Sequence, residues 1–226
     1  PRVRRQRQMC IRDSTKGATD IWWDTNNKYS QAWVVAPVQT TTCPAVIYVK
    51  DAKSGAKAAE IHTAGSGGGY SSTPVTMYPE GAKAGRLFIA TCNWSDKKET
   101  VTTGHPFTSR PYGMKFWYKY TPYQTDNFKV EIEIRSGNKV IAGGSYISEA
   151  ASSADSEYQE AYINLDYQGN MEKATDIYVN ILSTTKTSFG SDDLQKAGTI
   201  DLTDCATGWT THLGSRLKID DLELIY

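Results

Sequence analysis

The final stretch of the chain, Gly214-Ser-Arg-Leu-Lys-Ile-Asp-Asp-Leu-Glu-Leu-Ile-Tyr226, constrains the fold more than any other. Leu217 and Ile219 alternate with polar residues, and a second alternating apolar set begins at Leu222, but the two sets have opposite parity. Successive side chains of a strand point to opposite sides of a sheet, so both sets can face one core only if the strand takes in an extra residue. A β-bulge at Asp220-Asp221 would provide that residue. We therefore predict that the chain closes with a bulged, half-buried strand.

Strand patterns recur along the rest of the chain, whereas helical periodicity is nearly absent. The most regular alternation runs from Phe128 to Ile134, where apolar residues alternate with charged ones such as Glu131 and Glu133. This pattern is typical of an antiparallel sheet with one solvated side. Similar strand patterns occur in residues 43–50, 58–63, 86–94, 114–120, 158–167 and 176–183.

Turn signals separate these predicted strands. The segment Gly65-Ser-Gly-Gly-Gly69 is so rich in glycine that we expect a flexible loop there. Short strands separated by turns indicate two sheets packed face to face. A chain of 226 residues is long enough for one sizeable core. We predict an all-β fold, a two-sheet antiparallel β-sandwich, as a single domain over residues 15–226.

Residues 1–14 are set apart from this domain. The stretch 8–14, Gln-Met-Cys-Ile-Arg-Asp-Ser, resembles translated sequencing-adapter read-through, so we predict a non-native or disordered leader. The arginines within residues 2–7 are interpreted as a solvated tail. Because the chain begins at Pro1, an export signal can be missing from it.

Charge and hydropathy exclude two classes of partner. Lys plus Arg number 25 and Asp plus Glu number 25, so no overall field directs the chain to nucleic acid. No apolar run approaches the roughly 18 residues that a transmembrane helix needs. Three cysteines lie within the domain, Cys43, Cys92 and Cys205, and their spacing fits no zinc or redox motif. We predict buried thiols, with one disulfide plus a free thiol as the alternative.

Paired carboxylates are the groups that glycosidic hydrolysis requires. We predict that Asp220-Asp221 instead hydrogen-bonds the backbone of the bulge, in which case Asp220→Asn should cost little stability. The alternative is a calcium site with Asp220 as a ligand, because calcium prefers carboxylate and carbonyl oxygens. Glu131 and Glu133 lie on the solvated side of one strand and are interpreted as solubilising charges. We predict no catalytic residue, and no cofactor apart from this calcium alternative.

Tryptophans are the candidates for a sugar-binding surface, because flat aromatic rings stack on the apolar faces of sugars. Trp117 is the strongest of them, since it lies on the opposite side of its strand from Phe116 and should face outward. The other candidates are Trp94 at a strand end, Trp209 in a glycine- and threonine-rich loop, and Trp23. For each of the four, packing against the rim of the core is the alternative.

Several local patterns occur in a fixed order along the chain. They are Ser54-Gly-Ala-Lys-Ala-Ala-Glu-Ile61, Ala84-Gly-Arg-Leu-Phe88, Gly104-His-Pro-Phe-Thr-Ser-Arg-Pro111 followed by Trp117-Tyr-Lys-Tyr-Thr-Pro122, and the closing strand from Gly214. Over residues 45–226 this series resembles the putative carbohydrate metabolism domain of Bacteroidetes exported proteins. The resemblance implies a jelly-roll sandwich similar to carbohydrate-binding modules, on exported or lipid-anchored proteins of glycan-degrading bacteria.

These observations together lead to a functional expectation. We expect a non-catalytic, carbohydrate-binding-like module that helps an exported or surface protein to capture or process a glycan or polysaccharide. The expected location is extracytoplasmic, with outer-membrane anchoring through a missing N-terminal signal. Two alternatives stay open: a glycoside hydrolase, which needs an acid/base pair in a cleft, and a structural or adhesion module without a sugar site.

Overall fold

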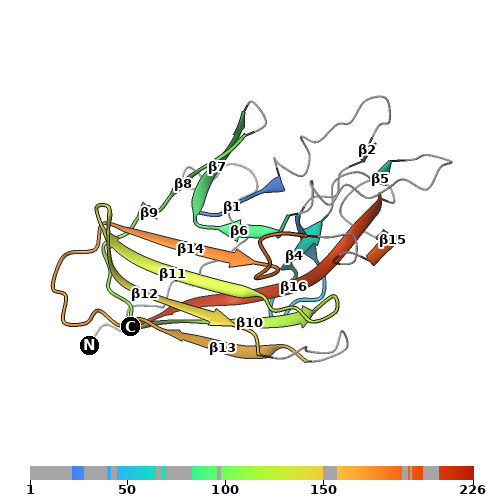
Figure 1. Cartoon of the computed structure of the whole chain (residues 1–226). Helices are drawn as coiled ribbons and strands as arrows, with labels where there is room; N and C mark the ends of the chain where they lie inside the picture. The colour runs from blue at the N-terminus through green and yellow to red at the C-terminus, as the bar shows by residue number, and fades with distance from the viewer. Residues whose placement is uncertain are drawn as a thin grey trace.

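The computed structural model describes residues 22–27, 40–41, 45–64, 68–69, 83–95, 98–149, 157–189, 193, 195–200 and 209–226 (Figure 1). Residues 1–14, Cys43 and Cys205 lie outside the described residues, so what the sequence predicts for them stays a prediction. The elements β1 to β16 are all strands, which confirms the predicted all-β class.

The first of two large sheets, the β10 sheet, is antiparallel throughout. Its spatial order is β13 (Gln159–Asn164), β10 (Gly113–Thr121), β16 (Trp209–Ile225), β4 (Ala58–Ala64) and β3 (Val46–Val49), and β15 (Gln195–Ile200) also pairs with β16. The last strand of the chain is therefore an interior strand of this sheet.

The second large sheet, the β11 sheet, is also antiparallel. Its order is β1 (Asp24–Thr25), β6 (Arg86–Phe88), β14 (Asp176–Leu182), β11 (Lys129–Ser136) and β12 (Lys139–Ile147), and β9 (His105–Pro106) also pairs with β14. Two smaller pairs join β2 (Thr40–Thr41) to β5 (Gly68–Gly69) and β7 (Ala90–Ser95) to β8 (Lys98–Thr103).

The chain crosses repeatedly between the two large sheets. It changes sheet from β10 to β11, from β12 to β13, from β13 to β14 and from β14 to β15. The sheets form two layers, with the β7–β8 hairpin rising from one side (Figure 1). The predicted two-sheet antiparallel sandwich of jelly-roll type is confirmed.

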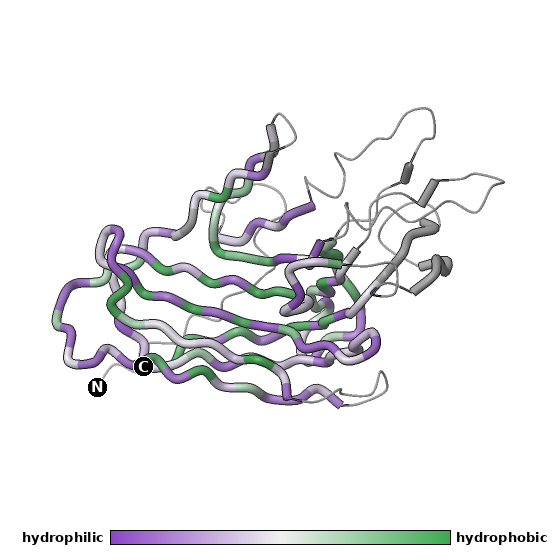
Figure 2. The backbone as a smooth tube through the Cα atoms, in the orientation of Figure 1, coloured by the Kyte–Doolittle hydropathy of each residue, from purple (hydrophilic) through white to green (hydrophobic). Residues whose placement is uncertain are grey.

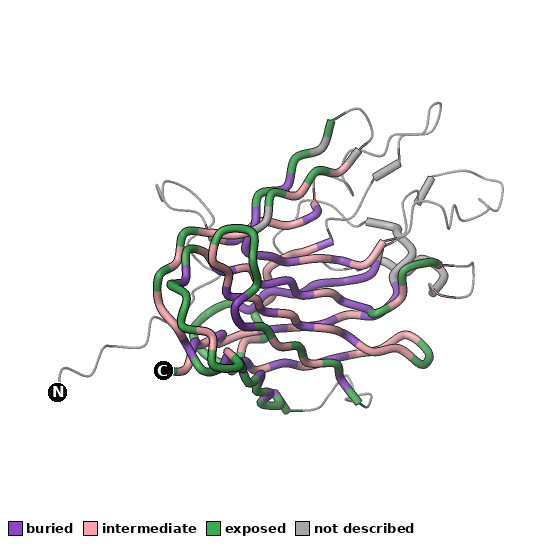
Figure 3. Tube along the Cα trace, turned by 60° about the vertical axis from the view of Figure 1, so that its left-hand side comes forward, coloured by how far each residue is buried: buried purple, intermediate pink, exposed green. Residues whose placement is uncertain are grey.

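The hydrophobic core lies between the two sheets, and both contribute alternate residues to it. Phe116 of β10 and Val130 and Ile132 of β11 are fully buried. The colours alternate along these strands both by hydropathy (Figure 2) and by burial (Figure 3). The period of two in the sequence therefore decides which side chains face outward.

The predicted β-bulge is present in β16. Between the pairs Lys115–Glu223 and Trp117–Asp220, β16 has one residue more than β10. Asp221 adopts a left-handed conformation there, with φ of 48°. The apolar residues on both sides of the bulge are buried in the one core, as the change of parity requires.

Three details differ from the sequence-based expectations. Gly68 and Gly69 belong to β5 rather than to a loop, because backbone hydrogen bonds form a strand pair without side chains. Trp209 begins β16 instead of lying in a loop. The predicted strand 86–94 divides at Ile89, whose N–H donates to the carbonyl oxygen of Val179 before β7 leaves the sheet.

Cys92 is fully buried, in agreement with the burial predicted for it. It packs with Phe88 and Ala90 in a small second cluster at the base of the β7–β8 hairpin. Among the residues that the structure describes, no helix has the length and apolar character needed to cross a membrane.

Candidate functional site

The outward side of the β10 sheet carries the residue that the sequence favours for ligand binding. We call this surface the Trp117 face, and its members on β13, β10 and β16 are Glu160, Tyr162, Lys115, Trp117, Lys119, Lys218, Asp220 and Glu223. The register places Trp117 between Glu160 on one neighbouring strand and Asp220 on the other. Three strands therefore contribute side chains to one patch.

The ring of Trp117 is partly exposed, and a lysine covers it. The Nζ atom of Lys53 lies 4.1 Å from the ring centroid. A cation–π contact at an exposed site is worth roughly 0.5–1 kcal/mol. Because Lys53 is itself exposed, its long side chain can leave the ring at little cost. Trp117 therefore presents an aromatic surface that only a flexible side chain covers from this direction.

The aspartates of the bulge fix the backbone of Lys53 and Ser54. The backbone N–H groups of Lys53 and Ser54 donate to Oδ2 of Asp220 at 2.9 and 3.1 Å. Oδ1 of the same carboxylate accepts from the N–H of Asp221 at 2.9 Å, and Oγ of Ser54 donates to Oδ1 of Asp221 at 2.6 Å. The aspartate pair organises both the bulge and the adjoining turn, which confirms its predicted structural role.

Lys115, next to Trp117 on the same face, has two carboxylate partners. Its Nζ atom lies 3.2 Å from Glu223 and 3.5 Å from Glu160. The hydrogen bond to Glu223 is the main cause that raises the pKa of the Lys115 ammonium, against a smaller opposing effect of burial. One ammonium is thus paired with two carboxylates in the middle of the face, and the three groups together carry one net negative charge.

Two further lysines share one carboxylate. Asp51 lies 3.1 Å from Nζ of Lys119 and 2.6 Å from Nζ of Lys218. The hydrogen bond from Lys218 is the largest cause that lowers the pKa of Asp51, and Lys119 adds to it against a smaller effect of burial. Lys53 differs from these lysines, because no carboxylate among the described residues lies within ion-pair distance of its ammonium.

A second aromatic ring on the face escaped the sequence analysis. Tyr162 of β13 lies opposite Lys115 and is 46% exposed. Its ring passes over Gly113, where an added Cβ would meet the Tyr162 hydroxyl at 2.0 Å. Glycine is therefore required at this position for the close approach. The outward parity of Tyr162, between the buried Ala161 and Ile163, is the signal that could have revealed it.

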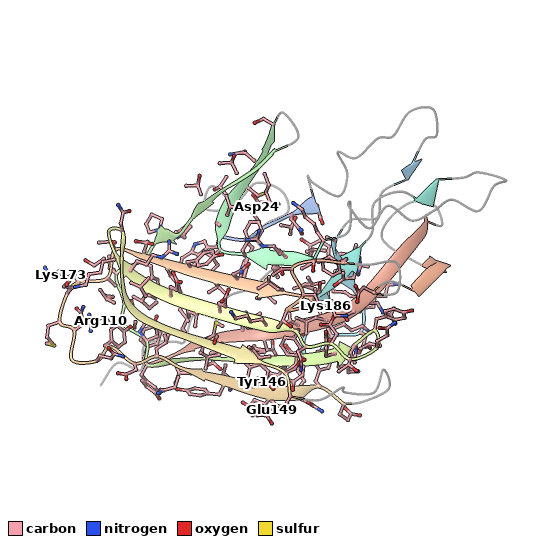
Figure 4. The ribbon with its side chains drawn as sticks, in the orientation of Figure 1. Asp24, Arg110, Tyr146, Glu149, Lys173 and Lys186 are labelled. Atoms are coloured by element: carbon pink, nitrogen blue, oxygen red, sulfur yellow. The ribbon has the colours of Figure 1, made fainter. Side chains whose placement is uncertain are left out.

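More tyrosines lie at the end of the sheet where β10 begins. The carbonyl oxygen of Tyr112 is 3.5 Å from the hydroxyl of Tyr162, and the Tyr112 side chain is 52% exposed. Tyr167 packs under the guanidinium of Arg110, whose Cζ atom lies 4.0 Å from the ring centroid. Figure 4 labels Arg110. This end of the sandwich therefore has an exposed tyrosine, Tyr112, and one that packs partly buried against the core, Tyr167.

The structure does not gather the other predicted tryptophans around Trp117. Trp23 is 4% exposed and belongs to the main core, a position that fits the core-packing alternative rather than a stacking surface. Trp94 lies in the β7–β8 hairpin, away from β10 (Figure 1), and its side chain is outside the described part. Trp209 lies at the far end of β16, about 20 Å along the strand from the pairs with β10. Its side chain is likewise outside the described part.

A metal site at Asp220 stays a prediction. Both carboxylate oxygens accept backbone N–H groups. Within the described ranges, no three histidine, cysteine or carboxylate side chains are grouped so as to hold a metal ion. The groups around the Asp220 carboxylate are thus N–H hydrogen-bond donors, which bind a carboxylate and cannot coordinate a cation.

The outward side of the β11 sheet, which we call the Glu131 face, has a different character. Its members are Arg86, Phe88, Tyr178, Asn180, Lys129, Glu131, Glu133, Arg135 and Ser145. Asn180 donates to Oε2 of Glu131 at 3.1 Å, and Arg86 donates to Oε1 of Glu99 at 2.8 Å and to Asn180 at 3.4 Å. Arg135 donates to Glu133. The two glutamates are therefore bound in ion pairs and hydrogen bonds on a solvated face.

Comparison with solved structures supports the architecture. The chain is similar to a putative glycoside hydrolase from Bacteroides thetaiotaomicron, with a TM-score of 0.56 and 16% identity, over 90% of this chain and 62% of that one. The chain thus spans less than two thirds of that protein. At this identity the likeness concerns the fold.

Weaker similarities involve two carbohydrate-binding modules. One, described in a study of modules from the β-sandwich superfamily, has a TM-score of 0.44 and 10% identity, over 98% of this chain and 62% of that one. The other is a family 11 module of a cellulosomal cellulase from Clostridium thermocellum, with a TM-score of 0.39 and 10% identity, over 97% and 94%. No curated protein matches the sequence.

The sequence itself matches a family over more than half of its length. Residues 4–135 match the family described as "Putative carbohydrate metabolism domain". The local patterns between Ser54 and Pro122 that resemble this family lie within the matched residues. The chain belongs to the putative carbohydrate metabolism domain family.

Proposed function

We propose that the chain is a non-catalytic carbohydrate-binding module and that the Trp117 face is its glycan-binding surface. The carrying observation is that Trp117 and Tyr162, on adjacent strands, present aromatic rings on the same outward face. Aromatic faces bind the apolar sides of sugar rings, and the charged groups around them can hydrogen-bond sugar hydroxyls. Membership of a carbohydrate metabolism family supports this choice of ligand.

The charged groups of the face support binding rather than hydrolysis. A glycosidase needs one carboxylic acid and one carboxylate free to act on the scissile bond. On the Trp117 face, Glu160 and Glu223 are paired with Lys115, and Asp220 is held by backbone N–H groups. We further propose an extracytoplasmic location, where a module of this kind meets polymeric glycans.

A glycan array followed by isothermal titration calorimetry on the strongest binder tests the function. We expect binding without product release, and a loss of affinity of at least about ten-fold in Trp117→Ala, as for a central aromatic contact. Val140→Ala is the control, because Val140 is 47% exposed on β12, in the other sheet. Release of shorter sugars would establish the hydrolase instead, and no binding to any glycan would favour the structural module.

A further inference from the structure

The aromatic rings of the Trp117 face are spread along a line rather than gathered at one point. Trp117 lies near the middle of β10, and the ring of Tyr162 extends over Gly113 toward the beginning of the same strand. The two positions on β10 are four residues apart, which is about 13 Å in a strand. This separation exceeds the length of a single sugar ring.

The line of rings ends at the backbone of the residue that precedes β10. The hydroxyl of Tyr162 lies 3.5 Å from the carbonyl oxygen of Tyr112. The aromatic surface therefore follows the direction of β10 from Trp117 to the beginning of the strand.

The charges of the face and the adjoining turn are balanced as a whole, because four ammonium groups (Lys53, Lys115, Lys119 and Lys218) accompany four carboxylates (Asp51, Glu160, Asp220 and Glu223). Between the two rings, Lys115 is already paired with Glu160 and Glu223. A carboxylate or sulfate on a ligand at this position would have to break these pairs or lie beside the acidic members of them. Hydroxyl groups can instead add hydrogen bonds to paired charges without disrupting them.

We propose that the Trp117 face binds a linear, neutral oligosaccharide of several units lying along β10, with Trp117 and Tyr162 stacking on different rings of one chain. This inference rests on the proposed function and adds to it the class of glycan and its direction on the sheet. Tyr162 is the residue that extends the site beyond one ring, and Tyr112 borders the site at its end.

Titration calorimetry with oligosaccharides of increasing length tests this inference. The probes are cello-, xylo-, galacto- and malto-oligosaccharides of one to six units, with oligogalacturonates and sulfated oligosaccharides as two acidic series. In the neutral series that binds, affinity should rise by at least about ten-fold between one unit and four, because linked contacts reinforce one another. Raising NaCl from 50 to 500 mM should change Kd by less than about two-fold, since no net charge is paired on binding.

Variants separate the two rings. Tyr162→Ala should remove most of the gain with length while binding to the shortest ligand persists, and Trp117→Ala should weaken every length. Unfolding midpoints of both variants show whether the fold is retained, and Tyr162→Phe, which keeps the ring, should retain the length dependence.

Several results would overturn the inference while leaving the proposed function intact. They are equal affinity for one unit and for four, a length dependence that Tyr162→Ala leaves unchanged, or a salt-sensitive preference for either acidic series. A preference for oligogalacturonates would identify a uronate ligand, and one for the sulfated series a sulfated ligand. A protein that binds none of the probes, and no glycan on the array, overturns the proposed function together with this inference.

Discussion

The two outward faces of the sandwich follow the same alternation but differ in where their aromatic rings lie. On the Trp117 face, Trp117 is partly exposed and Tyr162 is 46% exposed. On the Glu131 face, Phe88 is fully buried and Tyr178 packs against the small cluster beneath the β7–β8 hairpin. One face presents its rings to solvent, and the other packs them under a hairpin.

The polar groups of the two faces also differ in how far they are buried. A connected row crosses the Glu131 face from Glu99 through Arg86 and Asn180 to Glu131, and Asn180 in its middle is 6% exposed. Such buried polar rows stabilise a structure when every member is satisfied. The comparison teaches that alternation alone marks a face as outward, whereas ring exposure distinguishes a candidate binding surface from a structural one.

The largest effect that would test this difference is a change of stability on the Glu131 face. Asn180→Ala removes the bonds to Glu131 and Arg86 and should lower the free energy of unfolding by about 1–3 kcal/mol, because two hydrogen bonds from a nearly buried amide to charged groups are lost. Glycan affinity of the folded variant should not change. Urea unfolding and titration calorimetry measure the two quantities.

A matched control lies in the same row. Ser145 pairs in register with Glu131 but is exposed, so Ser145→Ala should change neither stability nor affinity. If Asn180→Ala abolished glycan binding and left stability intact, the binding surface would lie on the Glu131 face and the comparison would be reversed.

A smaller effect is expected from the aspartate that supports the Trp117 face. Asp220 accepts three backbone N–H groups with two oxygens, and asparagine would turn an N–H₂ group toward one of these donors. Asp220→Asn should therefore cost about 1–2 kcal/mol of unfolding free energy. This revises the small cost expected from the sequence, where the number of donors could not be seen.

Asp221→Asn is the companion variant, and it should cost less because asparagine tolerates the left-handed conformation of that residue. Melting temperatures with added calcium and with chelator test the ion alternative. A calcium-dependent rise in the wild type that Asp220→Asn removes would establish a metal site, since an ion that binds the folded state raises its melting temperature.

The smallest effect concerns the lysine over the tryptophan ring. Lys53→Ala uncovers Trp117 and should strengthen glycan binding by about two- to five-fold, because a sugar no longer displaces a cation worth roughly 0.5–1 kcal/mol. The free energy of unfolding should fall by at most about 1 kcal/mol, the worth of the lost contact. Lys50, exposed on the same segment but without this contact, provides the control Lys50→Ala. Weaker binding in Lys53→Ala would mean that the ammonium contacts the sugar itself.

The fold could be predicted further from the sequence than the site. The parity change around Asp220-Asp221 was sufficient to place the bulge, because a strand's period of two leaves no other solution. The outward position of Trp117 followed from the same rule. Neither the cation over its ring nor the hydrogen bonds from the turn at Ser54 could be predicted, because Lys53 and Trp117 are 64 positions apart and Ser54 and Asp220 are 166 positions apart.

Side-chain exposure was the second quantity that local patterns could not give. Trp23 and Trp117 are both tryptophans near strand segments, yet one belongs to the core and the other lies on a face. The difference arises from which elements pack over each ring, a property of tertiary structure. Tyr162 was missed because only tryptophans were considered as stacking rings. The alternation of the strand places its side chain outward, as it does for Trp117.

The position of β16 has a consequence for how the protein is made. This strand is the last in the chain, yet it lies between β10 and β4 and supplies the carboxylates that fix the turn at Lys53. A nascent polypeptide emerging from the ribosome lacks an interior strand of one sheet until synthesis has passed Ile225. Long-range strand pairing of this kind folds slowly and leaves unpaired edges in the meantime. The Trp117 face therefore cannot form until β16 has been synthesised, and a chain that stopped before Gly214 would lack the part of β16 that pairs with β10.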